Sequence, residues 1–83
     1  MINVVIYSRP GCHLCDQAKA AIFSSDCNDQ LIVTEVNIEA DQKLLKRFEK
    51  DIPVIEINGV VAFIHRVSPT EFRERIQWIA GES

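Results

Sequence analysis

The sequence predicts an α/β domain with the element order βαβαββα and a four-stranded mixed sheet that carries helices on both faces. Three observations support this prediction. The chain opens with an apolar, β-branched run over residues 2–7, which is typical of a central strand. A second strand-like run follows a helical stretch, and strand–helix–strand units pair their strands in parallel. An Asn58-Gly59 pair between two β-rich runs then predicts an antiparallel hairpin.

The first half of the chain divides into a strand, a turn and a helix. The run from Ile2 to Tyr7 is too uniformly apolar for an amphipathic helix, so we predict a strand buried on both faces. Pro10-Gly11 marks a turn. A helix from about residue 12 to Ser25 should follow, with Gln17 and Lys19 facing outward. Its apolar stripe consists of Leu14, Ala18, Ala21 and Ile22.

The second half adds a strand, a short helix, the hairpin and a last helix. We predict strands over residues 31–38, 54–57 and 60–64. A polar break at residues 39–41 and then a short helix to about Lys50 separate the first two of these strands. Leu44, Leu45 and Phe48 should face the core. Ser68 and Glu71 form the pattern of a capping box around Pro69, so a helix begins there, and Gly81 is expected to end it.

Length and composition restrict the classes of function. The 83 residues predict a single domain over residues 1–83. The net charge of -3 argues against nucleic acid as a partner, because phosphate binding needs a basic face. No apolar run approaches the roughly 20 residues of a membrane span, and the start of the chain has no secretory pattern. We therefore expect a cytoplasmic monomer with no membrane partner.

Two of the three cysteines, Cys12 and Cys15, lie three residues apart at the predicted start of the first helix. Residues at this spacing share a helix face, so their sulfur atoms can form a disulfide. The free N–H groups and the positive end of the helix should stabilise a thiolate at Cys12, and His13 and Arg9 are the nearest cations. We predict that Cys12 attacks disulfides and that the more buried Cys15 resolves the mixed disulfide.

Other interpretations of the cysteines and histidines remain open at this point. A structural zinc site needs about four ligands, and the chain offers only Cys27, His13, His65 and carboxylates beyond the cysteine pair. We therefore predict no metal site. Cys27 stands alone in a polar connection, where a bystander role is favoured over regulatory oxidation. His65, at the end of the last strand, is interpreted as a surface histidine.

The second informative segment is Ile52-Pro53. A proline is tolerated at the start of a strand because the ladder needs no donor there. From the sequence alone a helix terminator with a trans peptide bond is favoured over a cis bond, because few X–Pro bonds are cis.

The segment Tyr7-Ser8-Arg9-x-x-Cys12-x-x-Cys15, together with Ile52-Pro53 and Asn58-Gly59, resembles the glutaredoxins of the thioredoxin-fold superfamily. It is most similar to the small glutaredoxin-like proteins whose active site reads Cys-His-Leu-Cys, with Leu14 as the third residue. The resemblance implies a thioredoxin-like fold with Pro53 in the cis form beside Cys12. It also implies that the Ile52 backbone pairs with an extended substrate and that Arg9 contacts a glutathione carboxylate.

The sequence departs from the glutaredoxin pattern after the hairpin. Phe63-Ile64 and the basic residues His65-Arg66 stand where that family has a Gly-Gly pair and acidic residues around glutathione. Glycine allows a ligand to approach the backbone closely, and these residues do not. The departure argues against glutathione binding in the glutaredoxin manner. Thioredoxins have a buried acid in the central strand, but the first strand here holds no carboxylate. We therefore expect water, Asp16 or Glu56 to carry protons.

These observations predict a thiol–disulfide oxidoreductase that uses the Cys12/Cys15 dithiol and no tightly bound cofactor. Its substrate is expected to be a disulfide-containing protein or small molecule. Its reductant is expected to be glutathione, as a co-substrate, or an enzyme of the thioredoxin-reductase type. The alternative is a redox-regulatory or protein-binding module that keeps the fold and the dithiol but has weak turnover.

Overall fold

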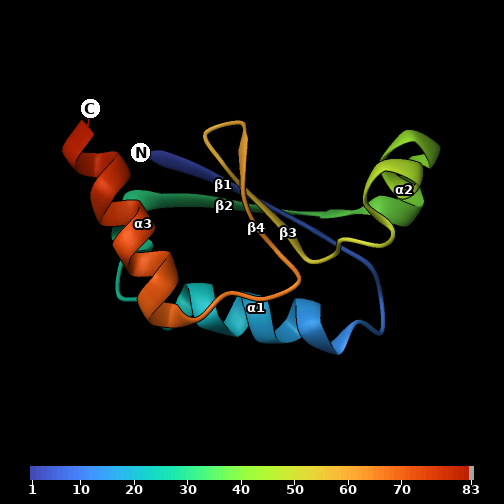
Figure 1. Ribbon diagram of the computed structural model, residues 1–83, viewed down its shortest axis with the longest axis horizontal. Helices are drawn as coiled ribbons and strands as arrows, with labels where there is room; N and C mark the ends of the chain where they lie inside the picture. Colours follow the sequence, from blue (N-terminus) through green and yellow to red (C-terminus); the bar gives the residue numbers. More distant parts are fainter. Residues whose placement is uncertain (83) are drawn as a thin grey trace.

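The computed structural model describes residues 1–82 and confirms the predicted order of the main elements (Figure 1). The four strands are β1 (Ile2–Ser8), β2 (Leu31–Asn37), β3 (Val54–Ile57) and β4 (Val60–Ile64). The three helices are α1 (His13–Phe23), α2 (Gln42–Phe48) and α3 (Pro69–Glu82). Two short 3-10 turns, η1 (Asn28–Gln30) and η2 (Ile38–Ala40), flank β2. The fold is the predicted α/β class.

The strands form one mixed sheet in the order β2-β1-β3-β4. β1 runs parallel to β2, with Ile6 opposite Glu35, and antiparallel to β3, with Tyr7 opposite Val54. β3 and β4 pair as an antiparallel hairpin. The first strand is therefore central, as its apolar sequence predicts.

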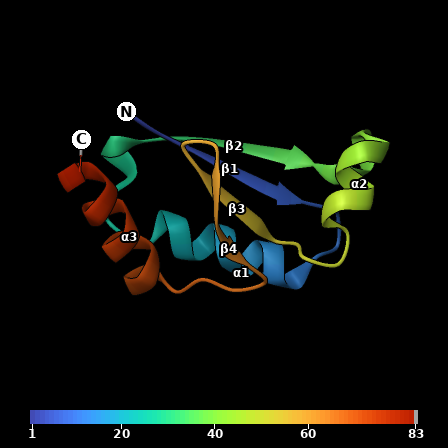
Figure 2. The ribbon, with the colours of Figure 1, turned by 45° about the horizontal axis from the view of Figure 1, so that its top comes forward.

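The helices divide unequally between the two faces of the sheet (Figure 2). α1 and α3 pack on one face and bury most of the core. The short α2 stands at the far end from α3 and packs on the other face, against Tyr7 and Val54. The main core consists of Val4, Ile6, Ala18, Ile22, Cys27, Leu31, Ile55, Ile57, Phe72 and Ile76.

This division corrects the prediction that β1 is buried on both faces. Val4 and Ile6, which point toward α1 and α3, are buried, whereas Val5 and Tyr7 on the other face are half-buried and Asn3 is exposed. The reason is that α2 is too short to cover more than one end of that face.

The local capping and turn signals appear at their predicted places. Asn58 and Gly59 have φ values of 50° and 83°, as a type I′ turn requires. At the start of α3, the Glu71 N–H donates to Ser68 Oγ and the Ser68 N–H donates to Glu71 Oε1, which is a complete capping box. α3 continues through Gly81 to Glu82, so the prediction that Gly81 ends the helix is wrong.

The ends of the other helices differ by a few residues from the predictions. α1 ends at Phe23 and not at Ser25, because the Ser24 and Ser25 N–H groups close the last turn and the Ser25 hydroxyl is buried against the Ile22 carbonyl. α2 begins after Asp41, whose carboxylate accepts the Lys43 N–H at 2.8 Å, and ends at Phe48.

The segments that contain Cys12, Cys15 and Pro53 lie at one end of the molecule. The start of α1, all of α2 and the loop that leads into β3 lie at this end, and both chain termini lie toward the opposite end (Figure 1). Because Tyr7 pairs with Val54, the register places Pro53 next to the end of β1, from which the chain runs directly to Cys12.

Candidate functional site

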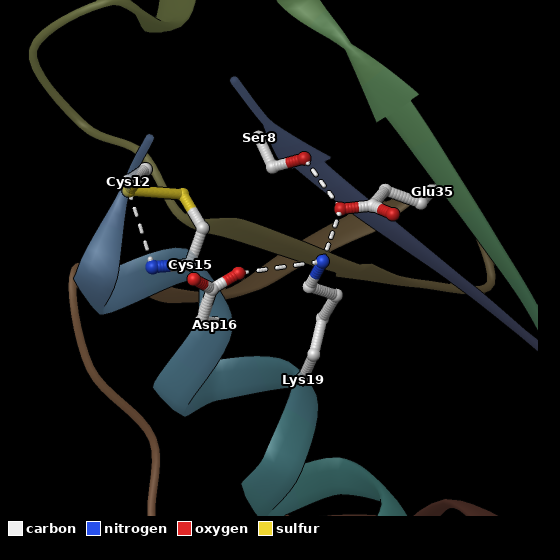
Figure 3. The surroundings of a disulfide bond; sticks show 6 residues. All are labelled: Ser8, Cys12, Cys15, Asp16, Lys19 and Glu35. Atoms are coloured by element: carbon white, nitrogen blue, oxygen red, sulfur yellow. Dashed lines mark hydrogen bonds and ion pairs between the residues drawn. A yellow bond between two sulfur atoms is a disulfide. The ribbon is translucent and has the colours of Figure 1, made fainter. Parts of the chain in front are cut away.

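Cys12 and Cys15 form a disulfide at the start of α1 (Figure 3). Their Cα atoms lie 5.2 Å apart, within the ordinary range for a disulfide. Cys12 is the residue that precedes the first helical turn, and Cys15 is the third residue of the helix. The predicted dithiol is therefore present at the predicted place.

The position of Cys12 gives its sulfur a backbone hydrogen bond. Its backbone is extended, with φ -92° and ψ 106°, and its Sγ accepts the N–H of Cys15 at 3.1 Å. The sulfur takes the place that a serine or aspartate oxygen has in an ordinary helix cap. In the reduced protein this atom is the thiol or thiolate sulfur. An N–H donor and the positive helix end both favour the charged form there.

Burial distinguishes the two sulfur-bearing residues. Cys12 is half-buried, whereas Cys15 is only 1% exposed. Between them, His13 is exposed and Leu14 is half-buried. Cys12 is therefore more accessible to a partner than Cys15.

Arg9 lies just before the dithiol loop but is engaged in an ion pair. Its guanidinium donates to the Glu39 carboxylate of η2 at 2.9 Å, and both side chains are about two-fifths exposed, at 41% and 43%. An anionic ligand would have to compete with Glu39 for this guanidinium.

The loop before β3 contains a cis peptide bond between Ile52 and Pro53, the isomer that the glutaredoxin resemblance implies. Pro53 itself is buried, and Ile52 is half-buried. The Ile52 N–H donates to the Phe48 carbonyl at 3.1 Å, where it closes the end of α2. In this structure the Ile52 donor is therefore used within the chain.

His65 fixes this loop from the end of β4. Its backbone N–H donates to the carbonyls of Pro53 at 2.9 Å and Asp51 at 3.3 Å, and its ring Nε2 lies 2.9 Å from the Lys50 carbonyl. Its φ of 68° is in the left-handed region that favours glycine. His65 is exposed, as predicted, but it also has a structural role that the sequence reasoning missed.

A polar cluster of four side chains lies beside the dithiol and joins β1, α1 and β2 (Figure 3). It consists of Ser8, Asp16, Lys19 and Glu35. Glu35 of β2 accepts from Ser8 Oγ of β1 at 2.8 Å and from Lys19 Nζ of α1 at 2.9 Å. Lys19 also lies 3.5 Å from Asp16 Oδ1. The hydrogen bond from Lys19, followed by that from Ser8, lowers the pKa of the Glu35 carboxyl. The bond to Glu35 raises the pKa of Lys19.

This cluster corrects one sequence prediction. Lys19 was predicted to face outward, but its ammonium reaches back to the sheet and its side chain is 32% exposed. Of the side chains predicted to carry protons, Asp16 pairs with Lys19, and Glu56 accepts from Tyr7 Oη at 3.2 Å. The sequence reasoning missed Glu35, which is the one carboxylate within β2 and lies opposite Ile6 in the register.

Tyr7 is fixed on the other face of the sheet. Its ring packs on Phe48 with centroids 4.6 Å apart. Burial, followed by the nearby Glu56 charge, raises the pKa of the Tyr7 hydroxyl. The hydroxyl therefore stays protonated and donates to Glu56.

Cys27 lies in the core, and Phe63 and Ile64 lie in the sheet. Cys27 is a core residue, 2% exposed, and its thiol lies 2.9 Å from Ser25 Oγ. Its place in the core corrects the interpretation of an isolated cysteine in a polar connection. Phe63 and Ile64 lie inside β4, so the chain turns toward α3 only at His65.

A cavity of about 290 Å³ opens beside Leu14, between α1 and the segment that joins β4 to α3. Its polar lining consists of Gln17, His65, Arg66, Ser68 and Glu71. Of these, His65 and Arg66 stand where the glutaredoxin pattern has acidic residues.

Among the side chains that the structure describes, residues 1–81, no three His, Cys, Asp or Glu side chains gather closely enough to hold a metal ion. No helix in this part of the chain is long and apolar enough to cross a membrane.

Comparison with known sequences gives a family match over most of the chain. Residues 3–78 match the glutaredoxin-like domain family (DUF836). A curated relative from Dictyostelium discoideum, the glutaredoxin-like protein YDR286C homolog, is 32% identical over 72 residues. That match covers 80% of this chain and 67% of the relative.

Comparison with solved structures shows the same fold. Protein XcR50 from X. campestris superposes with a TM-score of 0.79 at 23% identity, over 90% of this chain and 96% of that one. The oxidised thioredoxin from Plasmodium falciparum superposes with a TM-score of 0.63 at 11% identity, over 95% of this chain and 81% of that one. The chain therefore has a thioredoxin fold.

Proposed function

The chain belongs to the glutaredoxin-like domain family, and from this membership we propose that it is a thiol–disulfide oxidoreductase that works through Cys12 and Cys15. The family match and the thioredoxin fold support redox chemistry of this type. The specific reaction and the role of each cysteine are our proposal.

The observation that carries the proposal is the environment of Cys12. Its sulfur caps α1, accepts a backbone N–H and is half-buried, while its partner sulfur belongs to a residue that is 1% exposed. These features favour an accessible thiolate at Cys12 and a protected thiol at Cys15. A nucleophile and a resolving thiol need this division of properties.

The reaction has two exchange steps. The Cys12 thiolate attacks one sulfur of a substrate disulfide, forms a mixed disulfide and releases the other sulfur as a thiolate. Cys15 then loses its proton and attacks Cys12 Sγ, so the Cys12–Cys15 bond forms and the second substrate thiolate leaves. The substrate gains two electrons and two protons. An external thiol reductant must return two electrons and two protons to the Cys12–Cys15 disulfide.

We propose a disulfide in a protein or a small molecule as substrate, with the loop around Ile52 and Pro53 beside the reacting sulfur. Glutathione or an enzyme of the thioredoxin-reductase type supplies the electrons. The Arg9–Glu39 pair and the basic lining at His65 and Arg66 favour the second reductant, because neither arrangement matches the glutaredoxin pattern for glutathione.

Three single variants test the proposal. A fluorescent peptide disulfide serves as substrate and dithiothreitol as reductant. We expect Cys12→Ser to reduce the rate to that of dithiothreitol alone, and Cys15→Ser to accumulate a peptide adduct on Cys12 that mass spectrometry detects. Cys27→Ser is the matched control and should keep the rate. Catalysis that survives Cys12→Ser would refute the proposal, and a dithiol with no measurable turnover would support the redox-regulatory module instead.

A further inference from the structure

The polar cluster of Ser8, Asp16, Lys19 and Glu35 has no part in the two exchange steps of the proposed reaction. It connects β1, α1 and β2 directly beside the dithiol (Figure 3). The cluster contains a single positive group, the Lys19 ammonium, and two carboxylates hold it. The cluster therefore holds one positive and two negative charges at defined positions, and the ammonium is the group among them that favours a nearby thiolate.

Lys19 and Cys15 lie on the same face of α1. Lys19 follows Cys15 by four residues, so their side chains are neighbours on the helix surface. Helical side chains lean toward the helix start. Figure 3 shows the Lys19 side chain extending back in this direction, toward Asp16 and Glu35. Glu35 keeps the ammonium there by a contact of 2.9 Å.

The other charged groups near the start of α1 are engaged elsewhere or are solvated. Arg9, from the preceding loop, pairs with Glu39 of η2, and Glu56 of β3 accepts from Tyr7 of β1. His13 is exposed. On the side of Leu14, the charged and titratable residues that line the cavity are His65, Arg66 and Glu71. Lys19 is therefore the cation whose helical spacing places it next to Cys15.

Cys15 needs such a charge because it is buried. Burial in apolar surroundings raises the pKa of a thiol, yet the resolving step requires the thiolate. We propose that the Lys19–Glu35 ion pair positions a fixed positive charge beside Cys15 and so governs how readily Cys15 resolves the mixed disulfide. Lys19 and Glu35 are positioning residues in this scheme, because they touch neither substrate nor reacting sulfur.

The polar cluster lines a cavity of about 290 Å³ between the dithiol loop and β2, and Ser8, Gly11, Asp16, Lys19 and Glu35 are among its lining residues. Water is the acceptor that we propose for the proton of Cys15. The Cys15 thiolate then forms the bond to Cys12 Sγ, and the proton balance closes when the released substrate thiolate is protonated.

The test uses charge-neutralising variants that should act in opposite directions. The pKa of Cys15 is measured in the reduced protein by titration of its ¹³Cβ NMR signal. We expect Lys19→Gln to raise this pKa by about half a pH unit, because a unit charge several ångströms away and screened by water is worth roughly that much. Glu35→Gln should lower it by a similar amount. Near neutral pH these shifts correspond to about threefold slower and threefold faster resolution of a preformed Cys12 mixed disulfide.

Two more variants separate charge from structure. Lys19→Arg keeps the charge and should keep the pKa of Cys15. Ser8→Ala removes a hydrogen bond to Glu35 but no charge, so it should leave the pKa of Cys15 nearly unchanged. Shifts of the same sign in Lys19→Gln and Glu35→Gln, or no shift in either, would overturn the proposal. The inference rests on the proposed resolving role of Cys15, but the titration needs no turnover, so the two can fail separately.

Discussion

The dithiol segment and the Pro53 loop lie at the same end of the molecule but are stabilised in different ways. In the dithiol segment, Cys12, Cys15 and Asp16 are joined by bonds that span three or four residues of chain. The Pro53 loop depends on distant partners. His65 bonds to three carbonyls between Lys50 and Pro53 across 12 to 15 residues of chain.

This difference separates reactivity from docking. A reactive sulfur needs a helix start and a nearby second cysteine, and both are local features of the chain. A surface that receives a substrate needs a loop held at a fixed place beside that sulfur, and only the folded sheet supplies it. The reactivity of Cys12 should therefore survive changes that loosen the Pro53 loop.

Phe48→Ala should give the largest effect. Phe48 is 5% exposed and packs on Tyr7 in the small core under α2, beside the Pro53 loop. Loss of this ring should cost about 3–5 kcal/mol of unfolding free energy, measured by urea denaturation. The alkylation rate of Cys12 below the transition should stay unchanged. Phe23→Ala, at a ring that is 56% exposed, is the control and should change stability by less than about 0.5 kcal/mol. A slower Cys12 in Phe48→Ala would show that the two regions are not independent.

Substitutions of His65 should have a smaller effect on the same loop. His65→Ala removes the ring contact with the Lys50 carbonyl and should cost about 1 kcal/mol. His65→Gly also removes the ring, but it suits the φ of 68°, so we expect it to be less destabilising than His65→Ala. Denaturant titration of both variants measures the order. If alanine were tolerated better than glycine, the left-handed backbone at His65 would not matter to the loop.

The smallest predicted effect concerns Glu35, in the polar cluster beside the dithiol. The pKa of Glu35 is lowered in the folded protein, so its ionised form stabilises the fold above the ordinary value of 4.5. This contribution is lost as the pH falls through the lower, folded-state value. Because the Glu35 side chain is 46% exposed, the effect should stay below about 1 kcal/mol. Glu35→Gln should flatten the acid limb of the stability profile between pH 7 and 3. An unchanged acid limb would mean that the Lys19 contact adds no stability.

Much of the fold could be predicted because its signals are short-range. The apolar run of β1, the Asn58-Gly59 turn and the capping box at Ser68 each depend on a few neighbouring residues. The cysteine pair is of the same kind. Gly81 shows the limit of such signals, because α3 continues past a residue that often ends a helix.

The contacts that complete the site could not be predicted, because they join residues far apart in the chain. Lys19 and Glu35 meet only through the packing of α1 beside the β1–β2 pair, and His65 reaches the Pro53 loop only through the β3–β4 register. Arg9 was expected to contact a ligand, but in the folded chain it pairs with Glu39 of η2. Sequence spacing alone contains none of these distances.

The dependence of Cys12 alkylation on pH shows directly whether Cys12 is an activated thiolate. Reduced protein is treated with iodoacetamide across a pH series, and mass spectrometry follows Cys12, Cys15 and Cys27 separately. We expect half-maximal reactivity of Cys12 at a pH of about 7.5 or lower, with Cys15 reacting only at higher pH. A Cys12 midpoint near 8.5, the value of an ordinary cysteine, would contradict it.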